Sequence, residues 1–172
     1  MAIRTIITEP NKLLRQISKP VNAVGKEEQK LMDDMLETMY SANGIGLAAI
    51  QVGVPKRIIV MDISKDENKK EPRYFVNPVI KNKDTEKATY EEGCLSVPNQ
   101  FAEIDRPSKC EVEYLDYHGE KKLLKAAGLL ATCIQHEMDH LEGILFIDYL
   151  SKLKRSMIIK KLSKKKSTAA IL

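Results

Sequence analysis

The chain has 172 residues, of which 43% are hydrophobic and 30% are charged, and its formal net charge is +4. This length predicts a single domain, residues 1–172, around one substantial core. Three cysteines, an odd number, do not suit a disulfide framework, so we expect no disulfide partner and a cytoplasmic, reducing location. The first ten residues are too short and interrupted for a signal peptide, and no run of 18 apolar residues predicts a membrane span.

Residues 25–43 are predicted to form a helix that stops at Asn43-Gly44. Four apolar residues recur there at helical spacing: Leu31, Met35, Leu36 and Met39. The next residues, 44–49, fit the spacing of a dinucleotide-binding fingerprint, but that motif needs a strand before its glycines and a helix after them. Here a helix comes first and Pro55 follows soon after. We therefore interpret the segment as a flexible loop that delivers Gln51 to a functional site.

Strand-like segments occupy the middle of the chain. They are 57–63, 73–81, 88–90, 109–117 and 120–125. In the fourth segment, alternation places Cys110, Val112 and Tyr114 on one face, which predicts a strand with a packed thiol. His118 and Gly119 separate the last two segments and are typical of an exposed hairpin turn.

The pentapeptide His136-Glu137-Met138-Asp139-His140 matches H-E-x-x-H, which arises by chance in well under about 1% of chains of this length. At 100° per residue, His140 lies about 40° around from His136 and about 6 Å further along the axis, so both imidazoles reach one cation. Around the helix axis, Glu137 falls about 60° to one side of His140. There it is close enough to touch a water bound to that cation without binding the metal itself. Residues 128–135 are mostly apolar, which predicts a buried helix.

Two histidines require a further protein ligand, because catalytic metals usually take three protein ligands and a water. One protease class places its third histidine at the position of Phe146, and another takes a Glu from a later helix. No acidic residue follows Asp148, and Glu142 points elsewhere on the helix. The third ligand is therefore expected upstream of the motif.

Among the upstream donors, Cys133 lies on the motif helix itself, and binding through it would require the cation to bridge about 10 Å. Cys110 is expected in the core and His118 in a turn, which leaves Cys94. One thiolate and two imidazoles favour borderline-soft ions such as iron, zinc, nickel or cobalt over magnesium or calcium.

Three motifs, in order, give the chain a resemblance to a known family. They are Gly44-Ile-Gly-Leu-Ala-Ala-Ile-Gln51, Glu92-Gly-Cys-Leu-Ser96 and Gln135-His-Glu-Met-Asp-His140. With Pro10–Arg15 and Lys19–Val21, the chain resembles the peptide deformylases from about residue 5 to about residue 155. These enzymes remove the formyl group from the N-terminal formylmethionine of new bacterial proteins, and three ordered motifs are together highly specific.

The resemblance implies a role for each motif. Cys94, His136 and His140 would hold one divalent metal ion per chain, most often Fe2+, with Zn2+, Ni2+ or Co2+ as alternatives. Glu137 would take a proton from the attacking water and pass it to the departing amine. The amide of Gln51 and the backbone N–H of Leu95 would stabilise the oxyanion.

The resemblance also implies an apolar pocket for the methionine of a formylated nascent peptide. The matching positions are Ile45, Gly46, Glu92, Gly93, Leu129 and Cys133. Leu129, Cys133 and His136 share one helix face, which suits a pocket wall, and core packing is the alternative for the first two. Phe101 stands where relatives often carry a basic or aromatic residue at the edge of the groove, which leaves the preference beyond methionine open.

Residues 151–172 carry eight Lys or Arg and no acidic residue, so the rest of the chain has a net charge of −4. Apolar residues recur at roughly helical spacing from just before this segment onward: Leu150, Leu153, Met157, Ile158 and Leu162. We predict a basic amphipathic C-terminal helix or tail. It is either a docked helix with a solvated lysine face or, as in some relatives, an electrostatic contact to ribosomal RNA.

Strands followed by two late helices predict an α+β fold, with mixed or antiparallel sheets around a central H-E-x-x-H helix and a C-terminal helix. Two other function classes remain open. A different metallohydrolase, such as a peptidase, is disfavoured by the missing downstream ligand. A non-catalytic ribosome-associated module with a structural metal would need a fourth protein ligand, for which the sequence offers no good donor.

Overall fold

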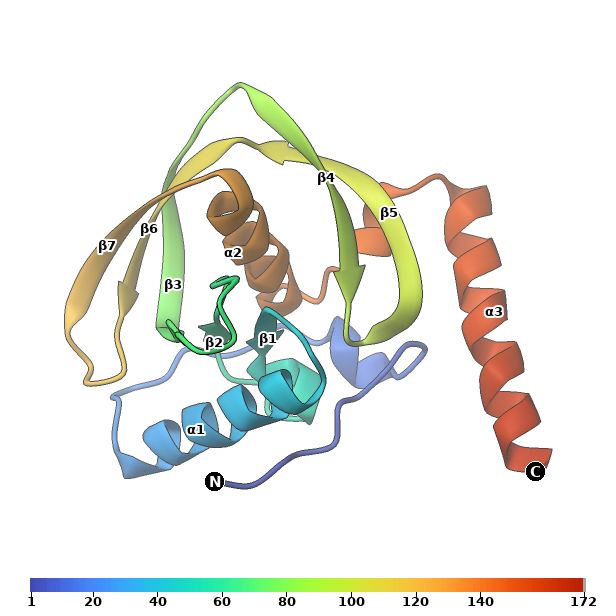
Figure 1. Cartoon of the computed structure of the whole chain (residues 1–172), viewed down its shortest axis with the longest axis horizontal. Helices are drawn as coiled ribbons and strands as arrows, with labels where there is room; N and C mark the ends of the chain where they lie inside the picture. Colours follow the sequence, from blue (N-terminus) through green and yellow to red (C-terminus); the bar gives the residue numbers. More distant parts are fainter. Residues whose placement is uncertain (172) are drawn as a thin grey trace.

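Two antiparallel sheets and three α-helices form the α+β fold that the sequence predicts (Figure 1). The computed structural model describes the backbone of residues 1–171 and the side chains of residues 1–164. The strands are β1 Gly46–Ala48, β2 Ile58–Met61, β3 Arg73–Lys83, β4 Lys87–Cys94, β5 Val97–Pro107, β6 Lys109–Leu115 and β7 Lys121–Ala127. The helices are α1 Lys26–Ser41, α2 Gly128–Leu141 and α3 Lys152–Ile171, and three short 3-10 helices are η1 Lys12–Arg15, η2 Ala49–Val52 and η3 Phe146–Tyr149.

The strands surround helix α2 on several sides. Five of them form one sheet in the order β1-β2-β3-β6-β7, and β4 pairs with β5 in a separate ribbon. Figure 1 shows α2 between the β3–β6–β7 side of the first sheet and the arch of β4 and β5. This arrangement lets α2 present residues to both sheets at once.

The apolar side of α2 packs into the core that the five-stranded sheet supplies. Ala131, Ile134 and Leu141 are fully buried there, together with Phe75 and Val112 from the sheet. Full burial of a side chain such as Ile contributes about 1.5–3 kcal/mol. The predicted strand face of residues 110, 112 and 114 packs into the same cluster, which confirms that alternation.

Helix α1 covers the other end of the molecule, as its apolar spacing predicts. Met32, Met35 and Met39 are fully buried in a second cluster with Leu47 and Val60. The side chain of Glu28 accepts the N–H of Gly25 at 3.0 Å and so closes the first turn of the helix.

One expectation about the segments that flank the site is wrong, and one strand there was missed. Residues 46–52 form strand β1 and the 3-10 helix η2, and not a flexible loop, because β1 is buried throughout and pairs with β2. A strand of three residues, such as β1, is too short to produce an alternating hydrophobic pattern in the sequence. Strand β5 was not predicted because polar residues occupy both of its faces: Asp105 is exposed and Arg106 is buried.

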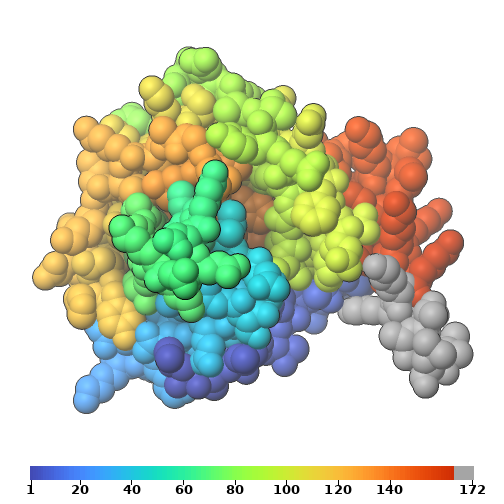
Figure 2. Space-filling model, in the orientation of Figure 1, coloured from blue at the N-terminus to red at the C-terminus, as the bar shows by residue number. Residues whose placement is uncertain are grey.

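Helix α3 begins at Lys152, and in Figure 2 the red C-terminal segment stands at one edge of the molecule. Ile158 and Leu162 are buried beside η3, whereas Leu153 and Met157 remain 72% and 52% exposed. The apolar face is therefore narrower than predicted. Residues 165–172 of the predicted basic helix or tail lie outside the residues whose side chains are described, and the extent of the single domain, residues 1–172, stays a prediction. No helix within residues 1–171 has the length and apolar character needed to cross a membrane.

Candidate active site and metal centre

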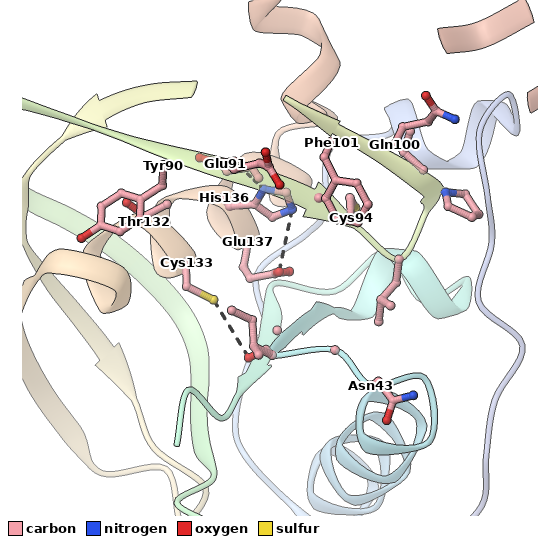
Figure 3. Close-up of a pocket in the computed structure, with 18 of the residues that line it drawn as sticks. Asn43, Tyr90, Glu91, Cys94, Gln100, Phe101, Thr132, Cys133, His136 and Glu137 are labelled. Carbon is pink, nitrogen blue, oxygen red and sulfur yellow. Dashed lines mark hydrogen bonds and ion pairs between the residues drawn. The ribbon is translucent and has the colours of Figure 1, made fainter. Parts of the chain in front are cut away.

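A cavity of about 520 Å³ opens between the start of β1, the β4–β5 ribbon and α2. Figure 3 shows Cys133, His136 and Glu137 entering it from α2, with Cys94 and Phe101 on the ribbon opposite. All six residues predicted to bind substrate line this cavity: Ile45, Gly46, Glu92, Gly93, Leu129 and Cys133. Their role in binding stays a prediction, but the fold brings them to one place.

Three potential metal ligands converge beside the cavity, whose lining includes Cys94 and His136 but not His140. The donor atoms of Cys94, His136 and His140 lie within 4.8 Å of one another. Cys94 Sγ is 3.4 Å from His140 Nε2, about the separation of two donors on one tetrahedral ion. Strand β4 ends at Cys94, and its pairing with β5 is irregular between Gly93 and Cys94. Irregularities in strand pairing change the direction in which side chains point, and this one lies directly before the Cys94 thiol. The donor set therefore fits a borderline-soft divalent cation.

The ring of His136 is held from two directions. Its Nδ1 lies 2.8 Å from Glu92 Oε1, which leaves Nε2 for a cation. Phe146, at the position where one protease class has its third histidine, is buried and stacks on the ring with centroids 6.2 Å apart. From the sequence, Glu92 was expected only in the substrate pocket, without a contact to His136.

Glu92 itself is fixed by a buried arginine that was not predicted from the sequence. Arg106 on β5 donates from Nε and Nη2 to the two carboxylate oxygens, at 2.7 and 3.0 Å. Burial alone raises the pKa of Glu92, but hydrogen bonds from His136 and Arg106 outweigh burial and leave the pKa below its ordinary value. The carboxylate is therefore ionised and accepts hydrogen bonds from both neighbours.

His140 is fully buried on the same helix face, one turn beyond His136. Burial lowers its pKa well below the ordinary value, and the charges of His136 and Arg106 act in the same direction. A neutral imidazole is the form that binds metals.

Glu137 is a buried carboxylate with an unused oxygen. The residue is 4% exposed, and its Oε2 has no hydrogen-bond partner within residues 1–164. Burial raises the pKa of Glu137 to about 7, close to the value that suits a group which takes and returns protons. Gly46 makes room for it, because a Cβ there would lie 2.6 Å from Glu137 Oε1.

Gln51 joins the first two motifs. Its Oε1 accepts the N–H of Ala48 at 2.9 Å, and its Nε2 lies 3.0 Å from Ser96 Oγ and 3.5 Å from Cys94 Sγ. The amide is therefore fixed beside the thiol, although Gln51 does not line the cavity itself. Ser96, which is fully buried, had no predicted role, and only its place in the Glu92–Ser96 motif could have indicated one.

The mouth of the cavity includes Phe101, whose side chain is 65% exposed. Its ring lies against Gly93 on the neighbouring strand, where a Cβ would come within 2.6 Å of the ring. On the opposite wall, Cys133 Sγ is 4.0 Å from the carbonyl oxygen of Ile45. Burial raises the pKa of Cys133 well above its ordinary value, so it is a neutral wall residue and not a nucleophile.

Comparison with known proteins places this geometry in a family. The polypeptide deformylase profile matches residues 3–156. The chain is 79% identical to a peptide deformylase of Pelagibacter ubique over 171 residues, which cover 99% of each chain. A peptide deformylase of Phenylobacterium zucineum is 58% identical over 95% of this chain and 97% of its own. The crystal structure of the Ehrlichia chaffeensis peptide deformylase superposes with a TM-score of 0.94 at 44% identity, covering 98% and 99% of the two chains. The chain belongs to the polypeptide deformylase family.

Proposed function

We propose that this protein is a metal-dependent hydrolase that removes the formyl group from the N-terminal formylmethionine of nascent polypeptides and releases formate. The observation that carries the proposal is the convergence of one thiol and two imidazoles at a cavity, beside a buried carboxylate with one oxygen that has no hydrogen-bond partner among residues 1–164. Membership of the deformylase family supplies the substrate class. We place the reaction in the cytoplasm, where a site thiol stays reduced.

Cys94, His136 and His140 would hold one divalent ion, most often Fe2+ in this family, with Zn2+, Ni2+ or Co2+ as alternatives. When bound, the ion would activate a water molecule and polarise the formyl oxygen. The hydrogen bond between Glu92 and His136 Nδ1 supports this assignment, because it leaves the other ring nitrogen free to bind.

Glu137 would be the general base and then the general acid. Its carboxylate takes one proton from the water whose oxygen forms a bond to the formyl carbon. It then gives that proton to the methionine nitrogen as the carbon–nitrogen bond breaks. A pKa near 7 lets one group serve both steps at neutral pH.

Gln51 and Leu95 would stabilise the negative charge that develops on the formyl oxygen. The side-chain amide of Gln51 is held in place by Ala48 and Ser96, so little reorganisation is needed. The backbone N–H of Leu95 would be the second donor. Preorganised donors of this kind commonly contribute about 3–4 kcal/mol each to lowering the barrier.

The methionine side chain would occupy the apolar part of the cavity. Ile45, Leu129 and Cys133 supply apolar surface, while Gly46 and Gly93 line the cavity with backbone alone. Glu92 closes the wall behind His136. An unbranched apolar side chain suits such a pocket. Phe101 lies at the mouth, where it would affect the preference for the substrate residues that follow the methionine.

The basic helix α3 is our candidate for a contact with the ribosome. Five lysines are exposed among its described residues: Lys152, Lys154, Lys160, Lys161 and Lys164. Positive charge on a helix at the edge of the molecule can contact phosphates without obstructing the cavity.

The first test is formate release from a formyl-Met tripeptide by anaerobically purified protein, run beside Glu137→Ala. We expect turnover in the parent and a loss of orders of magnitude in the variant. Cleavage of unformylated peptides instead would support a peptidase. Metal retention without any turnover would support a structural site and would contradict the proposal.

A further inference from the structure

We propose that Asp139 and Tyr149 are positioning residues that hold Arg106, and through Arg106 and Glu92 fix the ring of His136. The proposal rests on the metal-binding part of the proposed function. It assigns a task to the fourth residue of the H-E-x-x-H pentapeptide and to a tyrosine in η3. Neither residue lines the substrate cavity.

A continuous series of short contacts leads from the surface to the candidate metal ligand. The hydroxyl of Tyr149 donates to Asp139 Oδ2 at 2.7 Å, and Arg106 Nη1 donates to the same oxygen at 2.8 Å. Arg106 then binds Glu92 through Nε and Nη2, and Glu92 Oε1 lies 2.8 Å from His136 Nδ1. Four elements, η3, α2, β5 and β4, contribute one residue each before the series returns to α2.

The shape of the guanidinium group makes Asp139 necessary for this series. Two parallel contacts to Glu92 fix the plane of Arg106, but a two-point contact still permits the pair to tilt together. Asp139 holds the third donor, Nη1, from the opposite side. Arg106 is only 4% exposed, so water cannot substitute for a lost partner at low cost.

Tyr149 supports both members of the central ion pair. Its hydroxyl holds Asp139, and its ring lies under the Arg106 guanidinium, with Arg106 Cζ 5.0 Å from the ring centroid. Burial and the neighbouring carboxylate raise the pKa of Tyr149 to about 12, so the hydroxyl stays a donor across the working range. Removal of the hydroxyl alone would leave the ring contact intact, which makes its contribution separable.

The charges of the group explain its effect on His136. Two carboxylates and one guanidinium leave one unbalanced negative charge, and Glu92 directs it at Nδ1 of the imidazole. Cation binding requires the ring to hold its proton on Nδ1, which faces that oxygen at 2.8 Å, and its lone pair on Nε2. A displaced Arg106 would release Glu92 and loosen the tautomer and the orientation of the ring.

The outer end of the series opens into a second cavity, of about 680 Å³, which includes Arg106, Asp139 and Tyr149 in its lining. Glu92 and His136 line only the first cavity. Substitutions of Asp139 and Tyr149 therefore change no surface that touches substrate. A positioning role consequently predicts weakened metal binding with little change in KM.

The test uses the full chain loaded with Co2+ or Zn2+, and compares Asp139→Asn, Tyr149→Phe and the parent. The measurements are the rate of metal release into a chelator, the equilibrium metal affinity and the visible absorption of the Co2+ form. We expect Asp139→Asn to weaken metal affinity about 10–100-fold and to alter the absorption, with a smaller effect of Tyr149→Phe. Formate assays should show lower kcat at fixed metal concentration and KM within about twofold.

Glu142→Gln is a matched control, because Glu142 lines the same second cavity and pairs with Arg57 at 2.8 Å without a path to His136. Asp139→Glu keeps the charge and should recover part of the affinity, which separates positioning from misfolding. Parent-like affinity and absorption in Asp139→Asn would overturn the proposal, as would an equal loss in Glu142→Gln. Metal binding is measured without substrate, so absence of deformylation in the parent would sink the proposed function and leave this test intact.

Discussion

Helices α2 and α3 place polar residues in opposite environments. Ten of the fourteen residues of α2 are buried, including His136, Glu137 and His140. Among the described side chains of α3, only Ile158 and Leu162 are buried, and its lysines are exposed. A buried titratable group destabilises the fold unless it is paired or binds a ligand, whereas a solvated lysine costs almost nothing. Buried polar residues on α2 therefore carry far more functional information than the charges of α3.

The strongest test of this comparison is Glu137→Gln. The amide has nearly the same shape as the carboxylate but cannot accept a proton, so we expect formate release to fall about 10²–10⁴-fold. Metal content should stay near one ion per chain, because Glu137 is not among the three converging donors. Parent-like turnover of formyl-Met tripeptides would remove Glu137 as the base and would weaken the argument from burial.

Gly46→Ala tests whether the space around the carboxylate matters. The added Cβ would lie 2.6 Å from Glu137 Oε1 and 2.9 Å from its carboxyl carbon, so the carboxylate must move. Misplacement of a catalytic group by about 1 Å can cost about 10²-fold in rate. Gly44→Ala is the control, because its Cβ meets only the end of the Leu95 side chain, which can rotate. Equal rates for the two variants would contradict the assigned geometry.

The raised pKa of Glu137 predicts how the stability of metal-stripped protein depends on pH. The native carboxyl binds its proton more tightly than the unfolded one, with a pKa of about 7 against 4.5. The free energy of unfolding should therefore decline as pH rises from about 4.5 to about 7, by up to about 3 kcal/mol, and then level off. Denaturant unfolding at several pH values would measure this. The decline should be absent in Glu137→Gln, and its persistence there would assign it to another group.

The sequence could predict features that depend on local spacing, but not contacts between residues far apart in the chain. The spacing of His136 and His140 follows from helix geometry, and Cys94 remained after the other donors were eliminated, so the convergence of these three donors was predictable. Arg106 was not predicted, because an arginine in a strand is ordinarily exposed, and nothing local indicates that Glu92 and Asp139 enclose it. Contacts between residues far apart in sequence, such as Tyr149 with Arg106, depend on how β5 bends over α2, which no local periodicity encodes.

The smallest effects are expected on α3. Lys160→Gln with Lys161→Gln should change the rate on formyl-Met tripeptides less than twofold and stability by about 0.5 kcal/mol or less, because both side chains are exposed. If α3 contacts ribosomal RNA, however, ribosome binding measured against salt should lose about 0.7–0.9 in log–log slope for each phosphate contact removed. Lys121→Gln with Lys125→Gln removes the same charge from β7 and should leave the slope unchanged. Equal slopes for both pairs and the parent would mean that the lysines of α3 only keep a docked helix solvated.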